Sequence, residues 1–208
     1  MSNMDFTVDF YVISHWLENV IYRVQSIDTV TLSVCAGAFV AVIYITTSIK
    51  LKFSKRWRVK ASKRLMRKLL NNRDSFTAPK LLVYLKKIDP YLFEELLLTA
   101  FEARGLKVIR SKRYSGDGGV DGRFVMDEKL YLIQAKRYKN HIKKEHMIEF
   151  SNIVEKDKKA SGGVFIHTGR TGKETRQSAF KGGILIISGD NLYRLIMGLP
   201  LTMDGKLI

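Results

Sequence analysis

The sequence contains a single cysteine, Cys35, among its 208 residues. One thiol excludes an intramolecular disulfide framework and a cysteine-rich zinc site. The four histidines also lack the H-x-x-x-H and H-E-x-x-H spacings of zinc ligands: His15, His141, His146 and His167. Any bound metal is therefore expected to be a hard ion held by oxygen ligands.

Acidic residues are absent from residues 50–73, which contain eleven lysines and arginines. The whole chain has a formal net charge of +16. Such a basic balance favours an anionic partner and says nothing about the fold. The basic segment fits two partners, the anionic headgroups of a membrane and the phosphate backbone of DNA, and both interpretations stay open.

Charged residues are also absent from residues 29–49, which are rich in Val, Ile, Ala and Leu. This length predicts a transmembrane helix; a buried core helix or two strands is the alternative. Arg23 is the one basic residue before Asp28, whereas basic residues begin at Lys50. The positive-inside rule then predicts a single-pass protein of the inner (cytoplasmic) membrane, with its N-terminus outside and the remainder in the cytoplasm.

The composition divides the chain into four expected parts. These are an external or interfacial segment at 1–28, the transmembrane helix at 29–49, a basic juxtamembrane linker at 50–77 and a globular domain at 78–208. In the last part, patterns predict helices at 79–87, 90–104, 143–158 and 191–197, and strands at 106–110, 164–167 and 184–187. Helices that alternate with strands indicate an α/β fold with a mixed central sheet flanked by helices.

The most informative motif runs from Ser115 to Asp121 and is followed by Gln134-Ala135-Lys136. The segment between them reads as a hairpin with a tight turn at Asp127-Glu128. We expect that hairpin to bring Asp121 and Lys136 into one pocket. A carboxylate that binds a divalent cation beside an amine is suited to phosphodiester hydrolysis, so the motif predicts a metal-dependent nuclease.

Gln134 is neutral, so a metal site built on Asp121 needs a second carboxylate. Glu94 has helical spacing to Leu97, Leu98 and Phe101, and we expect it to face inward. Glu95 aligns with Thr99 and Glu102, which predicts a solvent-facing position. Three further residues have structural interpretations: Asp117 in a turn, His167 as a packed polar cap, and Thr171 as the cap of a helix with Glu174 three residues later.

Four motifs resemble the Mrr-type restriction endonuclease domain of the PD-(D/E)XK nuclease superfamily, over about residues 78–197. They are Phe93-Glu94-Glu95-Leu96, Gly116-Asp117-Gly118-Gly119-Val120-Asp121, Gln134-Ala135-Lys136-Arg137-Tyr138 and Thr168-Gly169-Arg170. The resemblance implies a restriction-endonuclease-like fold that cleaves DNA with Mg²⁺ or another hard divalent cation. It makes Asp121 the metal-binding aspartate, Lys136 the catalytic lysine, Gln134 the replacement of the second acid, and Glu94 the helix glutamate that completes the pocket.

Together these features predict a membrane-anchored DNA endonuclease, type IV-like, in restriction, defence or DNA processing. The expected metal ligands are Asp121, Glu94 and Gln134, and the expected DNA contacts are Arg137, Arg170 and Lys173. The expected partners are DNA, the lipid bilayer through residues 29–49, and a second copy in a homodimer. Two alternatives remain: a non-catalytic DNA-binding or membrane-docking protein on a retired nuclease scaffold, and a nuclease that acts on RNA.

Overall fold

The computed structural model describes the backbone of residues 6–25, 28–111, 119–203 and 205–208. The chain forms two compact units, Met1–Ser54 and Lys55–Ile208. The first contains helix α1 (Phe6–Gln25) and the beginning of helix α2 (Thr29–Asn71), which continues into the second unit. Residues Thr29–Thr47 of α2 are apolar and exposed, and this stretch is long enough to cross a membrane.

The second unit is built on a five-stranded mixed sheet with the strand order β1-β2-β3-β5-β7. Strands β1 (Lys107–Arg110), β2 (Gly122–Met126) and β3 (Lys129–Lys136) pair antiparallel. Strands β5 (Ala160–His167) and β7 (Ile184–Ile187) continue the sheet parallel to β3. This arrangement confirms the mixed α/β fold that the sequence predicts.

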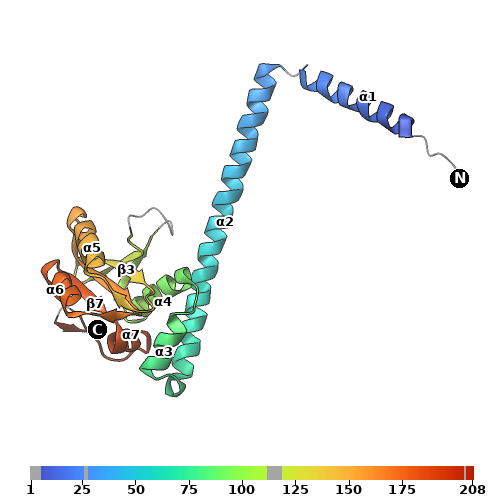
Figure 1. Ribbon diagram of the computed structural model, residues 1–208. Coiled ribbons are helices and arrows are strands. Elements are labelled where there is room, and N and C mark those ends of the chain that lie inside the picture. Colours follow the sequence, from blue (N-terminus) through green and yellow to red (C-terminus); the bar gives the residue numbers. More distant parts are fainter. Residues whose placement is uncertain (1–5, 26–27, 112–118, 204) are drawn as a thin grey trace. The chain divides into compact units, whose positions relative to one another are not determined.

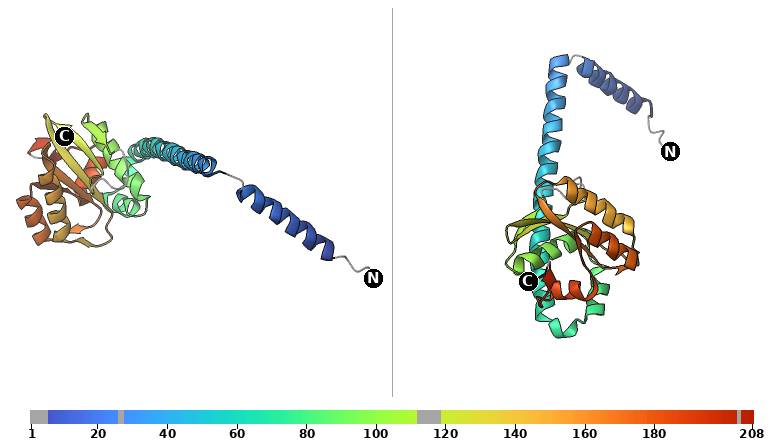
Figure 2. Two further views of the ribbon diagram at one scale, coloured as in Figure 1. Left: turned by 90° about the horizontal axis from the view of Figure 1, so that it is seen from above. Right: turned by 90° about the vertical axis from the view of Figure 1, so that its left-hand side faces the viewer.

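Helices cover both faces of this sheet (Figure 1). Helices α3 (Ala78–Leu85), α4 (Pro90–Ala103) and α7 (Gly189–Ile196) pack on one face, and α5 (Lys144–Lys156) and α6 (Lys173–Lys181) on the other. Figure 2 shows these layers from two further directions. Strand β3 supplies both cores, because its successive side chains point to opposite faces: Tyr131 and Ile133 to the first, Leu132 to the second.

Local signals in the sequence account for the ends of several elements. Asp89 caps α4, since its carboxylate accepts a hydrogen bond of 2.9 Å from the Leu92 amide. Gly105 follows α4 with a φ of +80°. Asp127 and Glu128 both have positive φ angles, 49° and 64°, which is the geometry of a tight two-residue hairpin turn. The turn predicted between β2 and β3 is thus confirmed.

The compact second unit begins at Lys55, before the boundary expected at residue 78. Helix α2 accounts for this difference because Met66 and Leu69 on it are 5% and 1% exposed and belong to the core beside α4. A short 3₁₀ helix (Arg73–Ser75) then leads to α3. Two small two-stranded ribbons complete the described fold: β4 (His141–Ile142) with β6 (Arg170–Thr171), and β8 (Thr202–Met203) with β9 (Lys206–Leu207).

Candidate active site

Asp121 is held at the start of strand β2 by two hydrogen bonds to β3. Its backbone N–H donates to the carbonyl of Ile133 at 2.9 Å, and its Oδ2 accepts from the Ala135 N–H at 2.7 Å. These bonds continue the β2–β3 register, in which Gly122 lies opposite Ile133. Asp121 therefore lies opposite Gln134.

Gln134 and Lys136 occupy the end of strand β3 and share one side of it, being two residues apart. The Gln134 amide is buried, and its Nε2 donates to the carbonyl of Gly119 at 2.8 Å. The side-chain oxygen of Gln134 is then the end of the amide that can bind a cation. Gly119 has a φ of +88°, and a Cβ there would lie 2.7 Å from the Gln134 Nε2, so the position suits glycine alone.

Glu94 on α4 completes the cluster. Burial raises the pKa of the Glu94 carboxyl to about 8, the negative charge of Asp121 adds to this rise, and the ammonium of Lys136 opposes it. Burial also raises the pKa of Asp121 to about 6, against the Ala135 hydrogen bond and the charge of Lys136. Asp121, Glu94 and Lys136 are thus close enough to act on one another electrostatically.

The expected solvent-facing position of Glu95 is wrong. Glu95 is 1% exposed, and its carboxylate accepts a hydrogen bond of 2.9 Å from Arg110 Nε. Thr99 is also buried, and its hydroxyl lies 2.8 Å from that of Ser62. Helix α2 covers this side of α4, so only Glu102 of the three aligned residues is exposed.

The donor set fits a hard divalent cation. Burial raises the pKa of both carboxyl groups, and the charge of Asp121 raises that of Glu94 further, so both gain from a nearby positive ion; an amide oxygen is also a hard ligand. In the part of the chain that the structure describes, no group of three or more His, Cys, Asp or Glu side chains could hold a metal. Mg²⁺ suits one or two carboxylates, because water and phosphate oxygens complete its shell.

Arg137, expected to contact DNA, has a partner inside the protein. Its Nη1 donates to the backbone carbonyls of Lys86 and Ile88, which join α3 to α4. This guanidinium holds the connection before α4 in place. The structure therefore gives Arg137 a structural contact in place of a free position facing a ligand.

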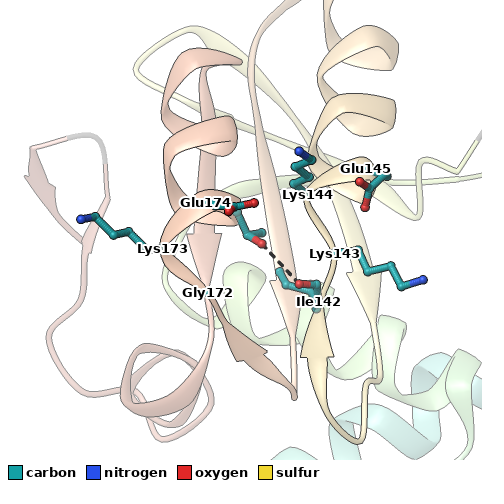
Figure 3. A pocket seen from close by; sticks show the side chains of 8 residues that line it. Ile142, Lys143, Lys144, Glu145, Gly172, Lys173 and Glu174 are labelled. Carbon is teal, nitrogen blue, oxygen red and sulfur yellow. Dashed lines mark hydrogen bonds between the residues drawn. The ribbon is translucent and has the colours of Figure 1, made fainter.

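Arg170 and Lys173 are both exposed. Lys173 lines a surface hollow of about 500 Å³ between the N-termini of α5 and α6: Ile142, Lys143, Lys144, Glu145, Gly172, Lys173, Glu174 and Thr175. Figure 3 shows Lys143 and Lys173 pointing away from each other, while the Thr175 hydroxyl bonds the Ile142 carbonyl at 3.3 Å. The lysines thus form a spread basic surface and do not converge on a single ion.

The expected cap at Thr171 is wrong, because its hydroxyl has another partner. Helix α6 begins at Lys173 after Gly172, and Thr171 belongs to strand β6. Its Oγ1 lies 2.9 Å from Nε2 of His167, whose Nδ1 accepts from the Gly169 N–H. Burial lowers the pKa of His167 to about 4, so this ring is neutral and structural, as expected of a packed polar cap.

Two basic residues of α2 lie near the cluster of Asp121, Glu94 and Lys136, and in the sequence they stand out only as members of the basic segment 50–73. The Lys55 ammonium donates to the carbonyl of Ser111, and the Arg58 guanidinium lies 4.3 Å from the centre of the Tyr91 ring. Their helical spacing with the buried Ser62 is the signal that could have identified them. Ser115 to Gly118, with the turn expected at Asp117, lie outside the described residues.

The chain is similar to the MspJI restriction endonuclease in complex with a 27-mer oligonucleotide, with 22% identity over 57% of this chain and 30% of that chain and a TM-score of 0.43. It is also similar to AF1548, a protein of unknown function (15% identity, 48% and 58%, TM-score 0.40). A third structure is SfsA of Pyrococcus furiosus in complex with Ca²⁺ (15%, 56% and 59%, TM-score 0.31).

The matched part spans less than two thirds of each of these three proteins. No curated protein matches the chain. The model of the Mrr_cat family, described as restriction endonuclease, matches residues 85–196, a range that contains Glu94, Asp121, Gln134 and Lys136. Because this match covers more than half of the sequence, the chain belongs to the Mrr_cat restriction endonuclease family.

Proposed function

We propose that this chain is a membrane-anchored endonuclease that hydrolyses phosphodiester bonds of DNA with Mg²⁺ or another hard divalent cation. The observation that carries the proposal is the cluster of Asp121, Glu94 and Lys136. Asp121 lies just before β2, Glu94 lies in the first half of α4, and Lys136 ends β3. Two carboxyls with raised pKa values beside an amine are suited to phosphoryl chemistry and are a poor choice for a merely structural position. The restriction endonuclease family supports the same activity.

Each side chain has a role in this mechanism. Asp121, Glu94 and the side-chain oxygen of Gln134 would hold the cation. The chemistry it would supply when bound is polarisation of a phosphate oxygen and a lower pKa for a water molecule. Lys136 acts in one of two ways: as a neutral amine it accepts the proton of the attacking water, and as an ammonium it stabilises the negative charge of the transition state.

The membrane part of the proposal rests on residues Thr29–Thr47 of α2 and on the charges that flank them. With basic residues concentrated after Lys50, we propose that the N-terminus is outside and the nuclease domain is cytoplasmic. A reporter enzyme fused to the C-terminus tests this orientation. If a reporter that works only outside the cytoplasm were active in this fusion, the proposed orientation would be wrong.

Plasmid cleavage tests the activity. The full-length chain in detergent micelles is incubated with supercoiled plasmid in Mg²⁺ or in EDTA. We expect nicking in Mg²⁺ alone, loss of nicking in Asp121→Asn, and a decrease of about 10²- to 10⁴-fold in Lys136→Ala. Lys129→Ala is the matched control, because Lys129 is an exposed lysine at the opposite end of β3.

Three results separate this function from its alternatives. Salt-sensitive plasmid binding without cleavage under any divalent cation would favour a non-catalytic DNA-binding protein. Faster cleavage of single-stranded RNA than of DNA with the same sequence would identify an RNA nuclease. Cleavage by Lys136→Ala at the wild-type rate would show that the proposed site is wrong. Linear products in addition to nicked circles would support a homodimer, since cutting both strands uses two sites.

A further inference from the structure

The basic part of helix α2, Lys55–Asn71, lies outside the matched residues 85–196 but inside the second compact unit. Its inner side carries the buried residues Ser62, Met66 and Leu69, which pack on the unit. Arg58 precedes Ser62 by one helical turn and shares this side of the helix. Arg58 is therefore directed toward the nuclease unit, and unlike Arg56 and Lys60 it is partly buried.

The contact of Arg58 with Tyr91 orients its charge. Its guanidinium carbon lies 4.3 Å from the centre of the Tyr91 ring, the geometry of a cation–π interaction. A planar group held on a ring has a fixed orientation, so it loses less entropy when its N–H edge binds a phosphate. Arginine also matches phosphate with two parallel hydrogen bonds.

The position of this guanidinium is beside the candidate active site. Tyr91 and Glu94 are three residues apart on α4 and thus lie one turn apart on the same side. Burial has the largest effect on the pKa of Glu94, and the charges of Asp121, Lys136 and Arg58 also act on this carboxyl. Arg58 therefore lies within electrostatic range of the group that we place in the metal site.

Lys55 extends the same edge of the helix toward Asp121. Its ammonium donates to the carbonyl of Ser111, and the Ser111 hydroxyl donates to the carbonyl of Val120 at 3.0 Å. Val120 is the residue before Asp121. The edge of α2 that carries Lys55 and Arg58 thus borders the site from the side of Asp121 as well as from the side of Glu94.

We propose that Arg58 binds a phosphate of the substrate strand next to the cleaved one. This inference rests on the proposed nuclease function. Each further nucleotide of a bound strand brings another phosphate, which a second cation beside the site can bind. In this arrangement α2 is a substrate-binding element of the nuclease unit, with its oriented cation above Tyr91.

The salt dependence of DNA binding tests this proposal. The affinity of the full-length chain in detergent for a fluorescent duplex is measured in EDTA over a range of KCl concentrations. Each lost phosphate contact lowers the slope of log K against log salt by about 0.9. We expect this decrease in Arg58→Ala, with about tenfold weaker binding. Arg58→Lys is expected to keep the slope, because it keeps the charge.

Arg58→Gln is the second variant, since it retains most of the stem and the packing on Tyr91. If Arg58→Ala is misfolded by circular dichroism, Arg58→Gln must show the shallower slope. Lys129→Ala controls for loss of one exposed lysine and is expected to keep the wild-type slope. An unchanged slope in both Arg58 variants would overturn the proposal, as would an equal decrease in Lys129→Ala.

The same measurement distinguishes this inference from the proposed function. If the wild type cleaves no DNA but Arg58→Ala lowers the slope, the nuclease function fails and the phosphate contact stands. If Arg58→Ala lowers only kcat of cleavage and leaves the slope unchanged, Arg58 acts through Glu94, and the phosphate contact is rejected.

Discussion

The hydroxyl oxygens of Ser62 on α2 and Thr99 on α4 lie 2.8 Å apart, and both side chains are buried. Each hydroxyl also bonds a backbone carbonyl of its own helix, that of Val59 or Glu95, so both buried polar groups are satisfied where the two helices meet. Lys63 also reaches Glu102 on α4 at 3.5 Å. The end of α2 is therefore an integral layer of the nuclease unit.

The first prediction concerns truncation of the chain within α2. A fragment of residues 74–208 lacks Met66 and Leu69, and loss of one such core side chain costs about 2–5 kcal/mol. We expect this fragment to lose its cooperative thermal transition, whereas residues 55–208 retain it. Circular dichroism at 222 nm checks both. Equal melting temperatures for the two fragments would show that the helix contributes nothing to stability.

The second prediction concerns pH. In the absence of a divalent cation, burial raises the pKa of Glu94 from 4.5 to about 8, so the folded state binds a proton that the unfolded state has released between these values. The contribution of Glu94 to the free energy of unfolding is therefore full below about pH 4.5 and is lost as the pH rises toward 8. We expect a lower melting temperature at pH 8 than at pH 6 in EDTA.

Glu94→Gln is the control for this dependence because it removes the titrating group and keeps the shape. The decrease between pH 6 and 8 should be smaller in Glu94→Gln than in the wild type, and Mg²⁺ should reduce it in the wild type only. Parallel curves for the two proteins would contradict the assignment.

The third prediction concerns Gly119. Its φ of +88° is unfavourable for any other residue, and an added Cβ would contact the amide of Gln134. We expect Gly119→Ala to reduce the kcat of DNA cleavage by displacing Gln134, and to lower stability by about 1–2 kcal/mol. Gly105 has a similar φ, +80°, but a Cβ added there would meet no atom within 4 Å, so Gly105→Ala is the control. It should lower stability alone; equal kcat values in both variants would argue against a role for Gln134.

The fourth prediction separates Arg137 from Lys173. Arg137→Ala removes hydrogen bonds to two backbone carbonyls, so we expect a stability loss of about 1–3 kcal/mol and an unchanged salt slope of DNA binding. Lys173 is exposed at the start of α6, so Lys173→Ala should keep the melting temperature and lower the slope by about 0.9. A lower slope with an unchanged melting temperature in Arg137→Ala would instead indicate that Arg137 contacts DNA.

Local patterns in the sequence predict most of the fold. The turn at Asp127-Glu128 depends on a few neighbouring residues, and the structure confirms it; the Asp89 cap at the start of α4 is equally local. The hairpin also explains why Asp121 and Lys136 could be paired in advance, because a tight turn fixes the register of its two strands.

The features that could not be predicted from the sequence depend mostly on contacts that form in the folded chain. Met66 and Leu69 are surrounded in the sequence by basic residues, so the segment does not read as a helix with a buried apolar side. The burial of Glu95 by α2 could therefore not be predicted. Thr171 matches a helix cap by spacing, but its hydroxyl bonds the ring of His167, four residues earlier, because the intervening residues turn between β5 and β6. Arg137 follows Lys136 directly, yet its partners are carbonyls about fifty positions earlier in the chain.

The hydrogen bond from the Ala135 N–H to the Asp121 carboxylate has a spectroscopic consequence. The chemical shift of an amide proton depends on the charge of its acceptor, so this resonance reports whether Asp121 is protonated, ionised or neutralised by a cation. Because Ala135 lies inside the central strand, few other groups influence it. One nuclear magnetic resonance signal can thus follow the occupancy of the site without substrate and without turnover.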